Sequence, residues 1–219
     1  MLLESLRWID AACDQMPVPG DDRHRLGLAA TDLLHEHARS VFHLLNVPPD
    51  RQPMVGSSLA LLRPIYEALV RSWFILYAAS DKEIASHIEG KDFDEKMVGL
   101  VKRVEQVHGL RHDGFLELVR KNYWRTLNGF THGGTEQLSR RINATNLGHI
   151  YSESDAVLAL LIANEFSLIA ATVALEIGNR MKLAVECQDR LARISQRLND
   201  DGETIRIAKE VSRMTPASE

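Results

Sequence analysis

The chain has 219 residues, of which 45% are apolar and 26% charged, and this composition excludes collagen-like, low-complexity and largely disordered proteins. Its 26 Lys and Arg and 30 Asp and Glu leave a net charge of −4, so any contact with nucleic acid or an anionic membrane needs a local basic patch. Cys13 and Cys187 are too far apart in sequence for a zinc or redox motif and indicate reduced thiols. Charged residues interrupt the apolar N-terminus, so we expect no signal peptide and a cytoplasmic protein.

The first half of the chain predicts helices separated by prolines, glycines and capping residues. Its apolar residues recur every three or four positions, and no run shows the two-residue period of a strand. Asp21 or Asp22 can cap the second helix, and Asp81 can cap the fourth. Pro64 is expected to bend the third helix or to break it after Leu62. In chain order the predicted helices cover residues 2–16, 23–46, 54–80, 81–89 and 92–108.

The second half predicts three more helices, at about 112–132, 155–180 and 183–214, with a looser stretch after Gly133-Gly134. The helix at 155–180 is long enough to cross a bilayer, but Asn164, Glu165 and Glu176 would be costly in hydrocarbon. Since no Lys or Arg bracket flanks it, we expect a core helix and no membrane association.

The terminal helix carries an apolar stripe among many charges, so it must pack on its own bundle or on a second copy of the chain. The stripe consists of Leu183, Cys187, Leu191, Ile194 and Leu198.

Together these patterns predict an all-α fold, an up-and-down type bundle of seven or more helices with a C-terminal amphipathic helix. We expect residues 1–182 to form the bundle domain and residues 183–219 to form the amphipathic helix and tail. The helices at 54–80 and 155–180 are apolar nearly all round, and they are therefore expected at the centre.

A first candidate site is a charged stripe on the third helix. Arg63, Glu67 and Arg71 fall on one face of an otherwise apolar helix, and buried charges persist only when they are paired. Glu165, isolated in the other apolar helix, is the expected outside partner. The stripe is interpreted first as a buried ion network that orients core helices, and second as a ligand site.

A second candidate is a polar row on the helix at 112–132. Lys121, Arg125, Asn128 and His132 lie within about 60° of one another on a helical wheel. Two cations, an amide and an imidazole can hold a phosphate and transfer a proton, although a solvated polar face explains the same pattern. At the C-terminal end of its helix, His132 is expected to favour the imidazolium form, or to act as a simple cap.

Metal ligation is a weaker possibility. His35 and His37 point about 200° apart on a helix and cannot share an ion, and His37 is expected in the core. The pairs Asp32-x-x-His35 and Glu105-x-x-His108, with Glu67 and Glu165, are similar to the ligand set of di-metal bundles. Asp32 and His35 are predicted on the polar side of their helix, so we expect no metal and no cofactor.

Two segments carry a resemblance to known proteins: SSLALLRPIYEALVRSWFILYAAS, and WRTLNGFTHGG some fifty residues later. Over roughly residues 1–180 the chain resembles an uncharacterised bacterial all-helical family that we group loosely with HEPN domains. HEPN domains are helical and usually dimeric, and many are metal-independent ribonucleases of toxin–antitoxin or phage-defence systems. Their motif is an Arg, four to six residues, and a His, and six residues separate Arg125 from His132. The residue after the motif Arg is commonly Asn, Asp or His; here it is Thr126, for which Asn128 can substitute.

The resemblance implies a homodimer that cleaves RNA, together with an antitoxin or defence partner protein. His132 would be the acid/base, Arg125 would contact the scissile phosphate, and Lys121 and Asn128 would position it. Two alternatives stay open. One is a non-catalytic homodimeric interaction or small-ligand-sensing module built on Arg63, Glu67 and Arg71, and the other is a di-metal carboxylate bundle.

Overall fold

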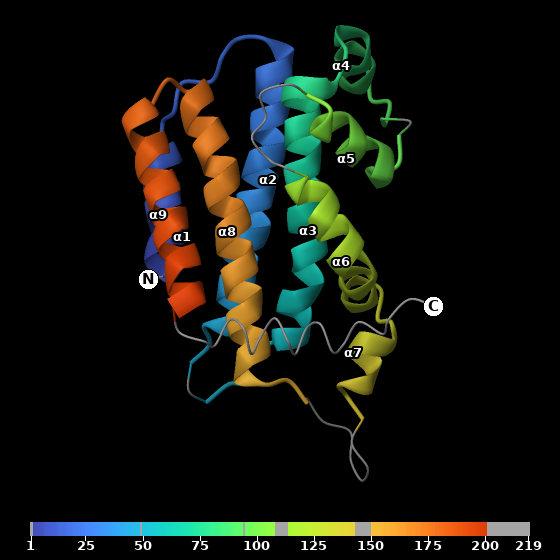
Figure 1. Cartoon of the computed structure of the whole chain (residues 1–219), viewed down its shortest axis with the longest axis vertical. Helices are drawn as coiled ribbons and strands as arrows, with labels where there is room; N and C mark the ends of the chain where they lie inside the picture. The colour runs from blue at the N-terminus through green and yellow to red at the C-terminus, as the bar shows by residue number, and fades with distance from the viewer. Residues whose placement is uncertain (1, 49, 94, 108–113, 143–149, 201–219) are drawn as a thin grey trace.

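The computed structural model describes residues 2–48, 50–93, 95–107, 114–142 and 150–200. These ranges contain nine α-helices and one π-helix and no β-strand, so the predicted all-α bundle is confirmed (Figure 1). The helices are α1 (Leu2–Cys13), α2 (Asp22–Leu45), α3 (Val55–Trp73), the π-helix η1 (Phe74–Ala78), α4 (Asp81–Ile88), α5 (Met97–Glu105), α6 (Phe115–Thr131), α7 (Thr135–Ser139), α8 (Glu153–Ile177) and α9 (Met181–Asp200).

Helices α2, α3 and α8 form the centre of the bundle and pack against one another. Figure 1 shows α1 and α9 beside α8, and α4 to α7 on the side of α3. The fully buried aromatic and aliphatic side chains concentrate on α3, η1 and α8, as the apolar sequences of these segments predict. The largest of them are Tyr66, Trp73 and Phe74.

Side-chain caps begin three of the helices. Asp21 accepts the backbone N–H of His24 at the start of α2. The cap of α4 is Ser80 and not the predicted Asp81, because Ser80 and Glu83 form a reciprocal capping box. Ser152 caps α8 in the same way, so this helix begins two residues before the predicted position.

Pro64 lies inside α3. The helix continues through it, and the predicted alternative of a break after Leu62 is wrong. Because proline has no backbone N–H, the carbonyl of Ala60 loses its partner within the helix. The hydroxyl of Thr131, at the end of α6, lies 3.1 Å from this carbonyl and 2.9 Å from the carbonyl of Leu127, so the two acceptors share its one proton. The proline therefore provides an attachment point for α6 on α3.

Helix α3 continues into η1, where the helix widens for one turn. The guanidinium of Arg23 on α2 donates to the carbonyls of Ile75 and Ala79, both at 2.7 Å. This long-range contact satisfies carbonyls at the end of η1 that lack helical partners. The sequence predicted one uninterrupted helix here, and the change of winding is a finding of the structure.

Within the described residues, α8 has the length and apolarity to cross a membrane, with a mean hydropathy of 2.0. Half of its most apolar window is buried inside the bundle, and the helix packs on α1, α2, α3 and α9. Such packing accounts for the apolar sequence of α8 as that of a core helix.

Helix α9 packs along α8. Ala184, Cys187 and Ile194 are at most 2% exposed, and Leu183 and Leu191 pack against the core. The apolar stripe of the terminal helix therefore docks on the chain's own bundle. The side chain of Leu198 and residues 201–214 of the predicted helix lie outside the described residues.

Several other predicted boundaries differ from the structure; α1, for example, ends at Cys13 and not at residue 16. Helix α5 is shorter than the predicted 92–108 and begins at Met97. The stretch after Gly133-Gly134 contains the short helix α7, which has too few residues for a helical period to be recognised.

Candidate functional site

The candidate site lies where α6 packs on α3, and it joins the two polar patterns of the sequence. Thr131 fixes the C-terminal end of α6 to α3 through the carbonyl of Ala60. The side-chain amide of Gln137 on α7 reaches the carbonyl of Gly56 at 3.4 Å. These contacts bring the charged stripe of α3 beside the polar row of α6.

Arg63 is at the centre of the site. Its Nε donates to Oε1 of Glu67 at 2.7 Å, one helical turn away. Its Nη1 is hydrogen-bonded to Nε2 of His132, and its guanidinium carbon lies 4.9 Å from the ring centroid of Trp124. The Arg63 and Glu67 side chains are 20% and 25% exposed, so the pair is partly shielded from water. One cation therefore holds together a carboxylate, an imidazole and an indole from two helices.

The contact with Arg63 gives Nε2 of His132 the role of hydrogen-bond acceptor. A guanidinium can only donate hydrogen bonds, so Nε2 of His132 must accept and carries no proton. His132 is the C-cap of α6, and its backbone N–H donates to the carbonyl of Asn128 at 3.0 Å. His132 therefore lies at the C-terminal end of α6 with the guanidinium of Arg63 against its ring.

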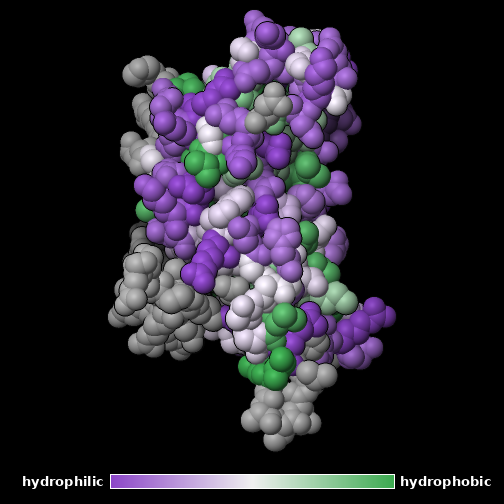
Figure 2. Space-filling view, turned by 90° about the vertical axis from the view of Figure 1, so that its right-hand side faces the viewer, coloured by the Kyte–Doolittle hydropathy of each residue, from purple (hydrophilic) through white to green (hydrophobic). Residues whose placement is uncertain are grey.

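The rest of the polar row faces outward. Lys121 is exposed and lies 3.5 Å from a carboxylate oxygen of Glu117. Arg125 is exposed and has no ion pair with any described residue. Asn128 is half-buried, and its Oδ1 is enclosed without a hydrogen-bond partner in the described part of the chain. Figure 2 shows this side of the molecule, whose surface is largely hydrophilic.

Residues 31–200 match the family of unknown function DUF6988, and this segment is most of the chain. The chain belongs to this family. The DUF6988 segment contains all the candidate site residues, from Arg63 to His132 and Glu165. No curated protein and no solved structure matches the chain.

Two members of the ion network predicted for this DUF6988 chain lie outside the α3–α6 site. Arg71 is exposed, and Glu165 has no ion pair among the described residues. Burial raises the pKa of the Glu165 carboxyl above its usual range. A single buried network of Arg63, Glu67, Arg71 and Glu165 is therefore not what the structure contains, because the stripe turns toward solvent at Arg71.

The predicted metal ligands do not converge. In the described residues no group of three or more His, Cys, Asp or Glu is placed to hold a metal ion. His35, predicted on the polar side of its helix, is buried and its Nε2 bonds to the carbonyl of Ser167 at 3.1 Å. His37, predicted in the core, is only partly buried. His108 lies outside the described residues.

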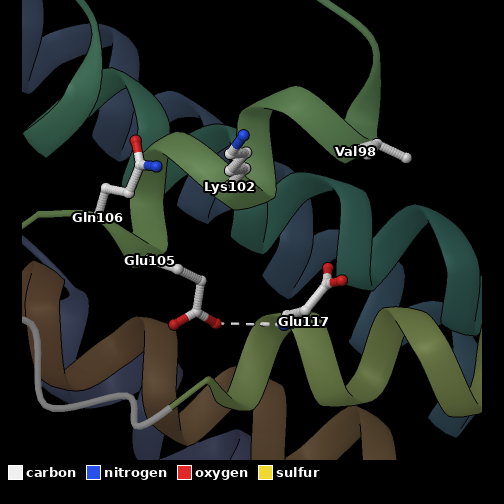
Figure 3. A pocket seen from close by; sticks show the side chains of 5 residues that line it. All are labelled: Val98, Lys102, Glu105, Gln106 and Glu117. Atoms are coloured by element: carbon white, nitrogen blue, oxygen red, sulfur yellow. Dashed lines mark hydrogen bonds between the residues drawn. The ribbon is translucent and has the colours of Figure 1, made fainter.

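Glu105 has a structural role at the start of α6. Gly114, the N-cap of α6, has no side chain that could accept a backbone N–H. Oε1 of Glu105 reaches from α5 and accepts the backbone N–H of Glu117 at 3.2 Å (Figure 3). A cavity of about 340 Å³ lies beside this contact, and Lys102 and Gln106 are among the residues that line it (Figure 3).

Sequence reasoning missed two residues that build the α3–α6 site of this DUF6988 chain, Trp124 and Thr131. Trp124 packs edge-on against Tyr66 and supports the guanidinium of Arg63. The signal for Thr131 was present in Pro64, since a proline inside a helix leaves a free carbonyl four residues earlier. No local pattern indicates which helix supplies the donor.

Proposed function

We propose that the chain is a metal-independent, HEPN-like endoribonuclease that works at the α3–α6 site. The observation that carries the proposal is the contact between Arg63 and His132, which holds an unprotonated imidazole nitrogen beside a cation. Such a nitrogen can accept a proton, and such a cation can neutralise a phosphate that replaces the imidazole as its partner.

In the proposed reaction Arg63 and Arg125 bind the phosphate between two nucleotides, and Lys121 contacts a neighbouring phosphate. Arg63 leaves His132 for the phosphate, which frees Nε2 to take the proton of the ribose 2′-hydroxyl. The 2′-oxygen forms a bond to phosphorus while the bond to the 5′-oxygen breaks, and that oxygen takes a proton from solvent. The products are a 2′,3′-cyclic phosphate and a free 5′-hydroxyl.

Two further features support this role. Arg125 and Lys121 are exposed on a chain whose net charge is −4, so they supply the local cations that a backbone contact requires. Asn128 has a buried carbonyl oxygen with no described partner beside the row, and we assign it to positioning. We also propose that the enzyme is a cytoplasmic homodimer whose activity is restrained by an antitoxin or defence partner.

The test is cleavage of a labelled single-stranded RNA by the purified full-length chain in EDTA. We expect a 2′,3′-cyclic phosphate product and a rate that falls as salt is raised. His132→Ala should lower the rate by roughly 10²–10⁴-fold, because it removes the proton-transfer group. His43→Ala, which changes an exposed histidine on α2, is the matched control and should leave the rate unchanged.

A protein that cleaves no RNA would overturn the proposal. Equal cleavage by the wild type, His132→Ala and Arg125→Ala would do the same. Either result favours the alternative of a non-catalytic interaction module.

A further inference from the structure

A second cavity lies on the other side of the bundle, between α1, α2 and α8. Its volume is about 350 Å³, within the range of pockets that hold small molecules. The wall is mostly apolar and includes Met16, Leu28 and Ala174. Thr31 and His35 are the buried polar residues of the lining, which also includes Cys13, Arg25 and Asp32.

His35 lines this cavity and is held in place by a hydrogen bond to α8. Its Nε2 lies 3.1 Å from the carbonyl of Ser167, which can only accept, so Nε2 carries the proton. Burial lowers the pKa of His35, which keeps the ring neutral. In the neutral ring Nδ1 is then an acceptor, and it has no partner among the described residues.

The other polar groups at the cavity limit the choice of ligand. The hydroxyl of Thr31 is already bonded to Ser72 at 2.8 Å and to the carbonyl of Gly27. Arg25 and Asp32, exposed and seven residues apart on α2, line the mouth with opposite charges. Their fields oppose one another, so the mouth selects neither an anion nor a cation.

We infer that this cavity binds a neutral small molecule with an apolar body and one hydrogen-bond donor, of the phenol or indole class. The apolar body contacts Met16, Leu28 and Ala174, and the donor reaches Nδ1 of His35. The inference does not depend on the proposed ribonuclease, whose residues belong to α3 and α6. A small molecule bound in this cavity would occupy a site separate from the proposed RNA site.

The test compares two probes of similar shape, phenol and anisole, because only phenol can donate a hydrogen bond. Both are titrated into the full-length protein and followed by backbone amide NMR shifts. We expect phenol to bind roughly tenfold more tightly than anisole, with shifts concentrated at residues lining the cavity. His35→Leu should remove the preference for phenol, whereas His37→Leu should keep it.

A second variant is needed because His35→Leu removes a buried hydrogen bond and can impair folding. Ala29 is exposed and lines the cavity, so Ala29→Trp can obstruct the cavity without disturbing the core. We expect it to weaken phenol binding at least tenfold while the melting temperature is unchanged. Equal binding of phenol and anisole, shifts away from α1, α2 and α8, or unaltered binding by Ala29→Trp would overturn the inference.

Discussion

Arg63 and Arg71 lie two turns apart on α3, yet their surroundings differ. Arg63 contacts Glu67, His132 and Trp124, whereas Arg71 is exposed. We predict that Arg63→Ala lowers the free energy of unfolding by about 1–2 kcal/mol, since it removes hydrogen bonds and leaves Glu67 without its partner. Arg71→Ala should cost less than about 0.5 kcal/mol. Urea denaturation of both variants gives the comparison.

The same two variants test whether the contacts of Arg63 with Glu67, His132 and Trp124 stabilise the protein. Equal effects of the two substitutions would mean that Arg63 is solvated like an ordinary surface arginine. That result would also remove the support for a hydrogen bond between Arg63 and His132.

The two histidines of α2 show what a helical wheel can and cannot predict. The helical wheel predicts His35 on the polar side and His37 on the apolar side, whereas the structure buries His35 and leaves His37 only partly buried. Helix α2 packs on both α3 and α8, so its buried surface is wider than the stripe of large apolar residues. A histidine can enter that surface because the carbonyl of Ser167 satisfies its ring N–H.

For the candidate site, the sequence placed Lys121, Arg125, Asn128 and His132 on one helix, but it could not show that Arg63 would face His132. That contact joins residues 69 positions apart. It depends on how α3 and α6 pack, and helical period within one segment carries no information on packing between segments.

Among the elements, the start of α4 offers a pH-dependent test. Glu83 accepts the backbone N–H of Ser80 and pairs with Arg103 at 2.6 Å, and these contacts lower its pKa to about 2. A carboxyl whose pKa is lower in the folded state stabilises the fold above its unfolded value of 4.5, and this contribution is lost as pH falls toward 2.

We therefore predict that Glu83→Gln is less stable than the wild type by about 1 kcal/mol at pH 7, after allowance for solvent screening. The difference should shrink below pH 4.5 and vanish near pH 2. Urea unfolding across this range is the measurement, with exposed Glu89→Gln as the control. A difference that stays constant with pH would show that the carboxylate charge has no part in the stabilisation.

The helices themselves were predictable where two signals coincide. Asp21 and the proline-rich segment at 47–53 bound α2 closely, because a cap and a breaker act on local backbone geometry. The predicted cap of α4 was displaced by one residue, since both Ser80 and Asp81 are good caps and only Ser80 has Glu83 three residues later. The π-turn at 74–78 left no local signal, because Arg23 supports it from another helix.

At the scale of the whole molecule, α9 covers a face of α8 that would otherwise be open. Ala184 is 1% exposed in this contact, while the adjacent Val185 is 52% exposed. We predict that Ala184→Asp destabilises the protein by roughly 3 kcal/mol or more, because it buries an unpaired charge. Val185→Asp should change stability by less than about 0.5 kcal/mol. Thermal melting of the two variants distinguishes them.

If Ala184→Asp melted like the wild type, α9 would not be docked on α8 in solution. The apolar stripe of the terminal helix would then need another partner. A second copy of the chain would be the first candidate, and a change in oligomeric state with concentration would identify it.

The order of the helices along the chain bears on how α8 is handled during synthesis. Helices α1, α2 and α3 leave the ribosome before α8, so three of its packing partners are already present when it emerges. The 20 residues of α9 follow at about 5–20 residues per second, so α8 waits roughly 1–4 seconds for its last cover. During that interval a segment with the length and apolarity of a membrane span has one side open. We therefore expect the apolar face of α8 to need protection from aggregation until α9 has docked.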